Sequence, residues 1–360
     1  MSHRGPSSVA VYVKEFSMAL PLSSSRRHAY RLLAVSAAAA LGLSACGGSS
    51  GTTGAAAGSN YPTGTITMVV PFSAGGPTDT VARLVAEPMS KTLGQQIIVQ
   101  NVEGAGGTLG AGEVAKAKND GYKVLMHHIG MSTAPALYSN LAFKPLESFQ
   151  TIGLVTEVPM TIISKKDLPP TNFKELVDYV KANKEKVTYA NAGVGSASQL
   201  CGLLIEKAFG VDLTEVPYKG TGPAMTDLVG GQVDFMCDQT TNTSAQIKPG
   251  KVKAYAVTTA ERVKSLPDIP TTTESGMPEL KVGVWHGLYA PAGTPEAVVK
   301  KLTDALAGAL KDPKVIEKMA DLGTAPEAAD QINPTAHTAK LKAQLDLWTP
   351  VIKAAGVKAA

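Results

Sequence analysis

The stretch of this chain best equipped to hold a small ligand runs from Val69 to Arg83 and reads VVPFSAGGPTDTVAR. It lies between a short β-rich run and a helical pattern, so we expect it to lead from the end of a strand into the start of a helix. Gly75 and Gly76 permit a tight turn and leave the backbone open to a ligand. A helix N-terminus presents free N–H groups and a positive dipole end, which attract anions. The loop therefore predicts an anion site, with an ordinary β–α turn as the alternative.

The same arrangement recurs twice further along the chain. Residues 186–190 form a second β-rich run, followed by the loop Asn191–Ser198 (NAGVGSAS) and a helical pattern over 199–209. A third β-rich run, 214–217, leads into the loop YKGTGP and another helical segment. Chance explains one such loop easily, but three loops at strand ends favour a site built from several of them.

Seven stretches of this sequence resemble those of one protein family and occur in the same order along the chain, which makes the resemblance specific. The stretches VVPFSAGGPTDTVAR, NVEGAGGTLGAGEVAKAKNDGYKVL, ALYSNLAFKPLESF, PYKGTGPAMTDLVGGQVDFM, KVKAYAVTT, LPDIPTTTESGMPEL and WHGLYAPAGTP resemble the periplasmic substrate-binding proteins of tripartite tricarboxylate transporters, also called the Bug family. The resemblance covers about residues 61–357. It implies an α/β, two-lobed type II periplasmic-binding-protein fold, with mainly parallel sheets, flanking helices and a ligand cleft between the lobes.

The resemblance also implies how the chain divides between the lobes. It places residues 61–158 and 284–360 in lobe 1 and residues 159–283 in lobe 2, so that the chain crosses between the lobes twice. The alternation of strand and helix patterns agrees with an α/β protein, and about 300 residues agree with two domains.

The first 45 residues have the features of an export signal. Basic side chains gather before residue 32, and the apolar run 32–43 has a length typical of a signal peptide and too short for a bilayer. The sequence LSAC ending at Cys46 resembles a bacterial lipobox, which predicts cleavage before Cys46 and a lipid anchor on it. Residues 46–60, rich in Gly, Ser, Thr and Ala, are typical of a flexible tether. Met18 is an alternative start of the chain.

Removal of residues 1–45 takes away five basic side chains and one acidic one, and leaves 29 of each kind. The mature chain is then formally neutral, so the net charge of +4 belongs to the export signal. Binding to nucleic-acid phosphates needs a net basic face. We therefore expect no nucleic-acid partner.

Motifs for catalysis, cofactors and metals find little support. Residues 104–110 (GAGGTLG) resemble a dinucleotide fingerprint, but the acidic residue expected about 20 positions later is missing, which favours a structural turn. His127 and His128 are adjacent in an expected strand, so they point to opposite faces and cannot easily share a metal. One of them is expected to face the cleft. We expect no enzyme activity, no cofactor and no metal site.

Two cysteines, Cys201 and Cys237, follow Cys46. In an exported protein a pair of cysteines favours a disulfide, and each lies beside a loop that is expected to form the cleft. Two separate buried thiols are the alternative.

The resemblance implies a receptor that captures a small organic carboxylate and delivers it to integral-membrane transporter subunits. Two opposed loops are expected to clamp the carboxylate, namely Ser73, Ala74, Gly75, Gly76, Thr78 and Asp79 in lobe 1, and Gly193, Gly195, Ser196 and Gln199 in lobe 2. The distal end and the walls of the cleft are expected to be formed by Lys219, Thr221, Asp238, Gln239, Tyr218, Trp285 and His127. The sequence departs from the commoner family pattern at Gln199, where His is frequent, and at residues 237–239, where Phe-Asp-Asn is frequent.

The receptor is expected to be a monomer that is lipid-anchored to a bacterial membrane and faces the periplasm. Two other functions fit the same pattern: a ligand sensor that docks on a membrane kinase, and an enzyme on a similar scaffold, for which no nucleophile or cofactor anchor is evident. The carboxylate itself is open among citrate-like, dicarboxylic, amino-acid and aromatic acids.

Overall fold

A computed structural model describes residues 60–358 of the chain. The expected signal peptide, the expected lipidation site Cys46 and the tether up to residue 59 lie outside the described residues. Within the described part, no helix combines the length and the apolar composition needed to cross a membrane. Strands and helices alternate along this part, as expected of an α/β protein.

The strands of the described part form one continuous sheet with the order β2-β1-β3-β9-β4-β7-β5-β6, and β8 also pairs with β4. Their bounds are Ile66–Val70 (β1), Ile97–Asn101 (β2), Lys123–His128 (β3), Phe149–Lys165 (β4), Thr188–Asn191 (β5), Thr214–Pro217 (β6), Phe235–Gln239 (β7), Val252–Val257 (β8) and Gly283–Pro291 (β9). The pairs of β1 with β2 and β3, and of β5 with β6 and β7, are parallel as predicted. The pairs made by β4 and β9 are antiparallel.

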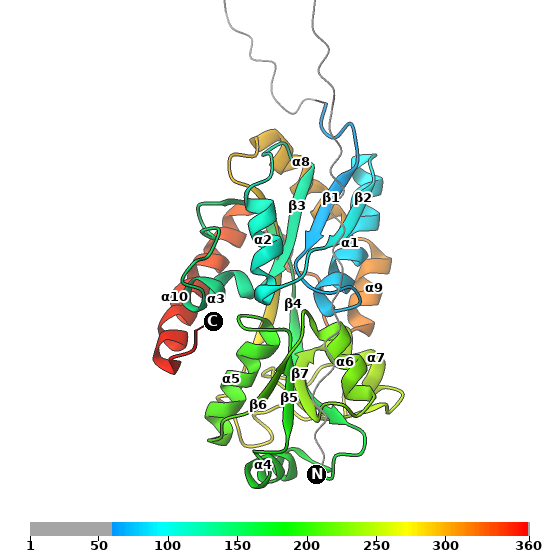
Figure 1. The fold of residues 1–360 in the computed structure, drawn as a ribbon. Helices are drawn as coiled ribbons and strands as arrows, with labels where there is room; N and C mark the ends of the chain where they lie inside the picture. Colours follow the sequence, from blue (N-terminus) through cyan, green and yellow to red (C-terminus); the bar gives the residue numbers. More distant parts are fainter. Residues whose placement is uncertain (1–59, 359–360) are drawn as a thin grey trace, which may run out of the picture. The chain divides into compact units, whose positions relative to one another are not determined.

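The long strand β4 divides the sheet into two halves (Figure 1). Its residues 149–159 pair with β9, whereas residues 160–165 pair with β7 and β8. The first half of the sheet holds β1, β2, β3 and β9, and the second half holds β5 to β8. The chain leaves the first half through β4 and returns to it through β9, which is why these two strands run antiparallel.

Helices pack on both halves (Figure 1). With the first half are α1 (Pro77–Leu93), η1 (Ala105–Gly107), α2 (Thr108–Ala115), α3 (Gly130–Leu137), α8 (Glu296–Ala309), α9 (Pro313–Asp321), η2 (Ala329–Gln331) and α10 (Pro334–Ala355). With the second half are α4 (Phe173–Ala182), α5 (Ala197–Phe209), α6 (Thr221–Val229) and α7 (Thr240–Ile247). Sequence signals explain several starts: Asn172 accepts a hydrogen bond from the Glu175 N–H (2.9 Å) at α4, and Asp312 accepts one from the Lys314 N–H (2.8 Å) at α9.

Apolar clusters hold the helices against the sheet. One cluster joins β1 to α1 and α8 in the first half and includes the fully buried Met68, Val85 and Leu302. Another extends through both halves, and in it Ile352 of α10 lies in the same cluster as Ile205 of α5. Burying a side chain of this size stabilises the fold by about 1.5–3 kcal/mol relative to leaving it exposed. The C-terminal helix of the first half is thereby held against the second half.

Candidate functional site

The N-termini of four helices meet around a small cavity at the boundary between the two halves. Helix α1 comes from the first half, and helices α5, α6 and α7 come from the second. The cavity has a volume of about 20 Å³ and is lined by Phe72, Pro77, Thr78, His128, Ala192, Ser196, Ala197, Ser198, Thr221, Asp238 and Gln239. Each helix N-terminus contributes unsatisfied N–H groups and a partial positive charge. The arrangement is therefore suited to an anion.

The loop before α1 is held in place by Asp79. This buried carboxylate accepts hydrogen bonds from the Gly75 N–H (3.0 Å), from Arg83 Nε (2.9 Å) and from Asn101 Nδ2 (3.0 Å). Burial alone would raise the pKa of Asp79, but the hydrogen bonds from Arg83, Gly75 and Asn101 outweigh it and hold this pKa below its ordinary value. Asp79 is therefore ionised, and it anchors the loop. Its carboxylate oxygens accept hydrogen bonds from residues of the first half.

Across the boundary, this loop meets the segment 219–222. The Ser73 N–H donates a hydrogen bond to the Lys219 carbonyl (3.2 Å). A Cβ added to Gly220 would lie 2.1 Å from Ser73 Oγ, and one added to Gly222 would lie 2.9 Å from the Ala74 carbonyl oxygen. The absence of side chains at these two glycines therefore allows the two segments to approach each other. The sequence analysis instead predicted that this loop faces residues 193–199 across the cleft.

The segment 193–196 meets a different part of the first half. The Val194 carbonyl accepts a hydrogen bond from the Tyr138 hydroxyl (2.7 Å), and the Gly195 carbonyl accepts one from Thr133 Oγ1 (3.0 Å). Within the segment, the Gly193 N–H donates to Asn191 Oδ1 (2.8 Å), and the Gly195 N–H donates to Gln199 Oε1 (3.4 Å). The N–H groups of Gly193 and Gly195 are therefore occupied, and the carbonyls of Val194 and Gly195 make the contact between the halves.

Buried polar atoms without partners gather in and beside the cavity. Among residues 60–358, no hydrogen-bond partner is present for Ser73 Oγ, Asn191 Nδ2, Thr221 Oγ1 or Gln239 Oε1. All four side chains are at least nine-tenths buried. A buried polar group without a partner is costly, so such groups usually mark a place where water or a ligand completes the hydrogen bonds. This set comprises two hydroxyls, one amide donor and one amide acceptor.

Asp238 is the acidic side chain of the cavity. It is 1% exposed and accepts a hydrogen bond from Asn242 Nδ2 (2.6 Å). Burial raises its pKa to about 6, against the opposing effect of the Asn242 amide, the Gln239 N–H and the nearby Thr221 hydroxyl. No Lys or Arg side chain of the described residues lines the cavity. Any charge on a ligand there is met by N–H groups, hydroxyls and amides.

The rings of the two adjacent histidines lie close together, with centroids 5.0 Å apart, so the opposite orientation predicted from alternation is wrong at this end of β3. His128 lines the cavity and stacks on Phe72 with ring centroids 4.6 Å apart. His127 is not among the lining residues, so the wall position expected for His127 is taken by His128. Its Nδ1 accepts a hydrogen bond from the His128 N–H (2.7 Å). Burial lowers the pKa of His127 to about 3 and that of His128 well below its ordinary value, so both rings are neutral near pH 7.

Several other expected contacts lie away from the cavity. Lys219 is exposed, and the Tyr218 hydroxyl donates a hydrogen bond to Asp227 (2.6 Å). Trp285 is buried on the side of β9 that faces α10, with its ring 6.0 Å from that of His337. Of the residues expected in the site, Thr78, Ser196, Thr221, Asp238 and Gln239 line the cavity. Asn191, Gly220 and His128 were not among the expected ligand-binding residues. Asn191 and Gly220 lie in loops that the sequence singled out, and one of the two histidines was expected to face the cleft.

The disulfide between Cys201 and Cys237 is present, with an S–S distance of 2.02 Å. It joins α5 to β7 directly beside the cavity, since Asp238 follows Cys237 and the lining residue Ser198 lies one turn before Cys201. The prediction of a bridge is confirmed, and the alternative of two separate thiols is wrong. No three His, Cys, Asp or Glu side chains between residues 60 and 358 are grouped so that they could hold a metal ion.

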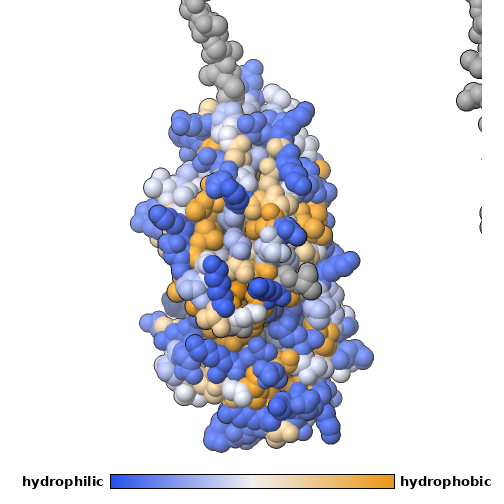
Figure 2. Space-filling model, turned by 60° about the vertical axis from the view of Figure 1, so that its left-hand side comes forward, coloured by the Kyte–Doolittle hydropathy of each residue, from blue (hydrophilic) through white to orange (hydrophobic). Residues whose placement is uncertain are grey.

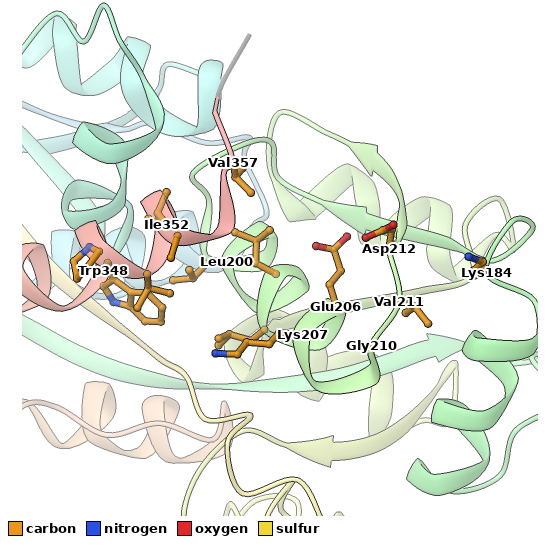
Figure 3. A pocket seen from close by; sticks show the side chains of 15 residues that line it. Lys184, Leu200, Glu206, Lys207, Gly210, Val211, Asp212, Trp348, Ile352 and Val357 are labelled. Atoms are coloured by element: carbon orange, nitrogen blue, oxygen red, sulfur yellow. The ribbon is translucent and has the colours of Figure 1, made fainter.

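A larger hollow of about 810 Å³ lies between α5 and the C-terminal part of α10 (Figure 3). Its lining is mostly apolar and includes Leu203, Trp348 and Val351, with Lys207 and Asp212 among the charged residues. Figure 2 brings the side of α10 and α5 forward and shows hydrophobic residues between hydrophilic ones across the middle of this face. None of the residues expected to bind a ligand lines this groove.

Two half-sheets joined by β4 and β9, with a polar cavity between helix N-termini, define a two-lobed periplasmic-binding-protein fold. The solved structure of the periplasmic binding protein BugD matches with a TM-score of 0.81 and 55% identity, covering 83% of this chain and 99% of that chain. The family described as the tripartite tricarboxylate transporter family receptor matches residues 81–357. The chain belongs to this family.

Two further relatives cover nearly the same part of the chain. MatC of Rhodopseudomonas palustris, solved with bound malate, is 43% identical with a TM-score of 0.79, covering 81% of this chain and 100% of that chain. A protein of Agrobacterium vitis, named as a UPF0065 protein in the TAR-I ttuE-ttuC' intergenic region, is 55% identical over 297 residues. That match covers 82% of this chain and 86% of the relative.

Proposed function

We propose that this protein is a periplasmic receptor that captures a small organic carboxylate between its two lobes and delivers it to the membrane subunits of a tripartite tricarboxylate-type transporter. The observation that carries the proposal is the meeting of four helix N-termini around a cavity with buried, unpartnered polar side chains. A carboxylate is stabilised by such N–H groups and hydroxyls without a cationic side chain. The malate bound by MatC supports the same ligand class.

The proposed lobes are residues 61–158 with 284–360, and residues 159–283. The partners of β4 change between Pro159 and Met160, and β9 begins at Gly283, which supports these bounds. The cavity of about 20 Å³ has room for about one water molecule. A di- or tricarboxylate is larger, so the lobes must move apart to admit it and to accommodate it.

Within this site, we assign direct ligand contact to the lining residues Thr78, Ser196, Thr221, Asp238 and Gln239, and to Ser73 beside them. The other residues of the predicted loops, namely Ala74, Gly75, Gly76, Asp79, Gly193, Gly195 and Gln199, would shape the loops. The assignment follows from the positions of the unpartnered hydroxyls and from the internal hydrogen bonds described above.

The proposal includes a lipid anchor on Cys46, a monomeric receptor and no catalytic role. The LSAC sequence before residue 47 supports the anchor. Intact mass and detergent partitioning of the exported protein test it, and we expect Cys46→Ala to abolish partitioning. An export product that stays in the aqueous phase in both forms would contradict the anchor and leave the receptor function in place.

Ligand binding is tested with a thermal-shift panel of L-malate, succinate, adipate and citrate, followed by calorimetry. Thr221→Val removes an unpartnered buried hydroxyl and keeps the shape of the side chain, so we expect about tenfold weaker binding without loss of stability. Thr226→Val on the same helix is the matched control, because Thr226 is exposed and its hydroxyl bonds only the Gly222 carbonyl (3.4 Å). Equal affinity in the two variants would place the ligand elsewhere.

A further inference from the structure

Asp238 is an unusual side chain for a site that holds an anion. Its carboxyl group lies in the cavity, buried, with the neutral amide of Asn242 as its side-chain partner at 2.6 Å. No cationic side chain of the described part lines the same cavity. Asp79 is also acidic and close to the site, but it is ion-paired with Arg83 (2.9 Å). The two acids of the cleft therefore differ in whether their negative charge is balanced.

A ligand carboxylate held at the N-termini of α5, α6 and α7 comes close to Asp238, because Asp238 lines the same cavity wall as Ser196, Thr221 and Gln239 of these N-termini. Two ionised carboxylates at such a distance repel each other strongly where water is excluded, and such pairs usually share one proton. A shared proton turns the repulsion into an O–H to carboxylate hydrogen bond, which is among the strong hydrogen bonds in proteins. The proton can come from bulk water, and no other reactant is needed.

We propose that Asp238 is protonated in the ligand-bound receptor and donates its O–H to a carboxylate oxygen of the ligand, so that each ligand is captured together with one proton. The inference rests on the proposed function, because it requires a carboxylate in this cavity. At mildly acidic pH, a protonated Asp238 would thus favour the binding of a ligand whose carboxylates are all ionised. The other carboxyl oxygen of Asp238 would still accept the hydrogen bond from the side-chain amide of Asn242.

Other titratable groups around the cavity do not supply this proton near neutral pH. His128 lines the cavity from the end of β3, and burial lowers its pKa well below the ordinary value. His286 of β9 contacts Thr78 Oγ1 through Nε2 (3.3 Å), and burial lowers its pKa to about 4. On β5, burial raises the pKa of Tyr189 well above its ordinary value, so it stays neutral. Glu215 of β6, whose pKa burial also raises, is not a lining residue.

Burial that raises the pKa of Asp238 to about 6 sets the pH range of the effect. If the protonated form alone binds, affinity falls about tenfold for each pH unit above this pKa. Between pH 6 and 8 the loss is then roughly fifty-fold, by the linkage between proton and ligand binding.

The experiment is calorimetry with L-malate on wild-type protein and on Asp238→Asn. Titration at pH 7.5 in two buffers of different ionisation enthalpy counts the protons taken up, and titration at pH 6 and pH 8 gives the affinity. For wild type we expect uptake of about one proton and the roughly fifty-fold loss at pH 8. The amide of Asp238→Asn donates at every pH, so we expect no proton uptake, an affinity independent of pH, and tighter binding than wild type at pH 8.

Asp234→Asn is the matched control, because Asp234 precedes the opposite end of β7 and is ion-paired with Lys165 (2.6 Å). It should keep both the proton uptake and the pH dependence. Malate binding without proton uptake, or weaker binding by Asp238→Asn at both pH values, would overturn the inference and indicate an ionised Asp238 that accepts from the ligand. No binding of malate, succinate, adipate or citrate to wild type at either pH would contradict the proposed function itself, and the inference with it.

Discussion

Two of the hollows between the halves of the described part differ in almost every property. The cavity at the helix N-termini measures about 20 Å³ and is lined by hydroxyls, an acid and neutral polar groups. The groove between α5 and α10 measures about 810 Å³ and is lined mostly by apolar residues, among them leucines, valines and Trp348. Helix α5 borders both, with its N-terminus at the cavity and its side at the groove.

If the proposed site is right, the size of a hollow is a poor guide to ligand binding in this fold. The small cavity contains buried polar atoms that lack partners, and these atoms gain hydrogen bonds when a ligand arrives. In the groove, the indole N–H of Trp348 already donates a hydrogen bond to Gln344 Oε1 (2.9 Å). The capacity to recognise a small anion is thus concentrated in the smaller of the two.

The largest expected effect concerns the stability of the unliganded protein as a function of pH. Asp238 has a pKa of about 6 in the folded protein against an ordinary value of 3.8, so the folded state holds this proton more tightly than the unfolded state. The resulting stabilisation is fully present below about pH 3.8 and is lost as the pH rises through about 6. The shift of about 2 pKa units corresponds to about 3 kcal/mol.

Asp238→Asn carries no such proton, so its stability relative to wild type should rise by up to about 3 kcal/mol between pH 4 and 7.5. Urea unfolding of both proteins across this range measures the difference and cancels the titration of the other groups. A constant difference over the whole range would contradict the burial of an acid in the cavity.

The second prediction tests the close approach of the two halves at Gly220. A valine there would place its Cβ 2.1 Å from Ser73 Oγ and 2.8 Å from the Ser73 backbone nitrogen, so the halves cannot close. We expect Gly220→Val to weaken malate binding at least about hundred-fold, which is about 2.7 kcal/mol. Gly231→Val is the control, since Gly231 also has a positive φ (76°) but no atom within 4 Å of an added Cβ. If both variants lose binding equally, backbone strain rather than closure is responsible.

A third prediction separates binding from stability at single hydroxyls. Ser73 Oγ has no partner in the described part, so Ser73→Ala should lower malate affinity about tenfold and leave the free energy of unfolding unchanged or slightly higher. Ser164 Oγ is hydrogen-bonded to the Tyr255 hydroxyl (2.8 Å), so Ser164→Ala should lose about 1 kcal/mol of stability and keep its affinity. Calorimetry should show an affinity loss only in Ser73→Ala, and urea unfolding a stability loss only in Ser164→Ala. If Ser73→Ala lost stability and kept its affinity, as expected for Ser164→Ala, Ser73 would not belong to the site.

The smallest expected effect lies in the groove. Val351 lines it and is 41% exposed, so Val351→Ser removes apolar surface without opening the core. We expect malate affinity to stay within about twofold and stability within about 0.5 kcal/mol. A tenfold change in affinity, measured by calorimetry, would show that the groove and the cavity are coupled through α5.

Much of the fold could be predicted from the sequence, for identifiable reasons. The ordered resemblance implied both the two lobes and the two crossings of the chain between them, and the strand–loop–helix patterns indicated the starts of α1, α5 and α6. The direction of β4 and β9 relative to their neighbours could not be read from periodicity, because alternation of side chains is the same in parallel and antiparallel strands. Only the hydrogen-bonding partners distinguish the two.

The candidate site was predictable where strands end, because the carboxyl ends of neighbouring parallel strands lie at one edge of a sheet. Thr78, Ser196 and Thr221 follow strands, Asp238 lies near the end of β7, and all four line the cavity. Alternation predicts opposite faces for His127 and His128, but their ring centroids lie 5.0 Å apart, because packing at the end of β3 overrides the pattern. Trp285 shows the same limit, since its strand was expected in the right place but its side chain lies on the opposite face.

The disulfide between α5 and β7 has a consequence for how fast a ligand is captured. Three of the four helix N-termini around the cavity, those of α5, α6 and α7, belong to the second half, and the bridge from Cys201 to Cys237 keeps two of its walls together when the halves part. Under the proposed function, an arriving anion would meet these three donors already assembled, whereas the N-terminus of α1 would join only on closure. The association rate would accordingly depend on the second half, and the contacts of α1 would mainly set how long the complex lasts before it dissociates.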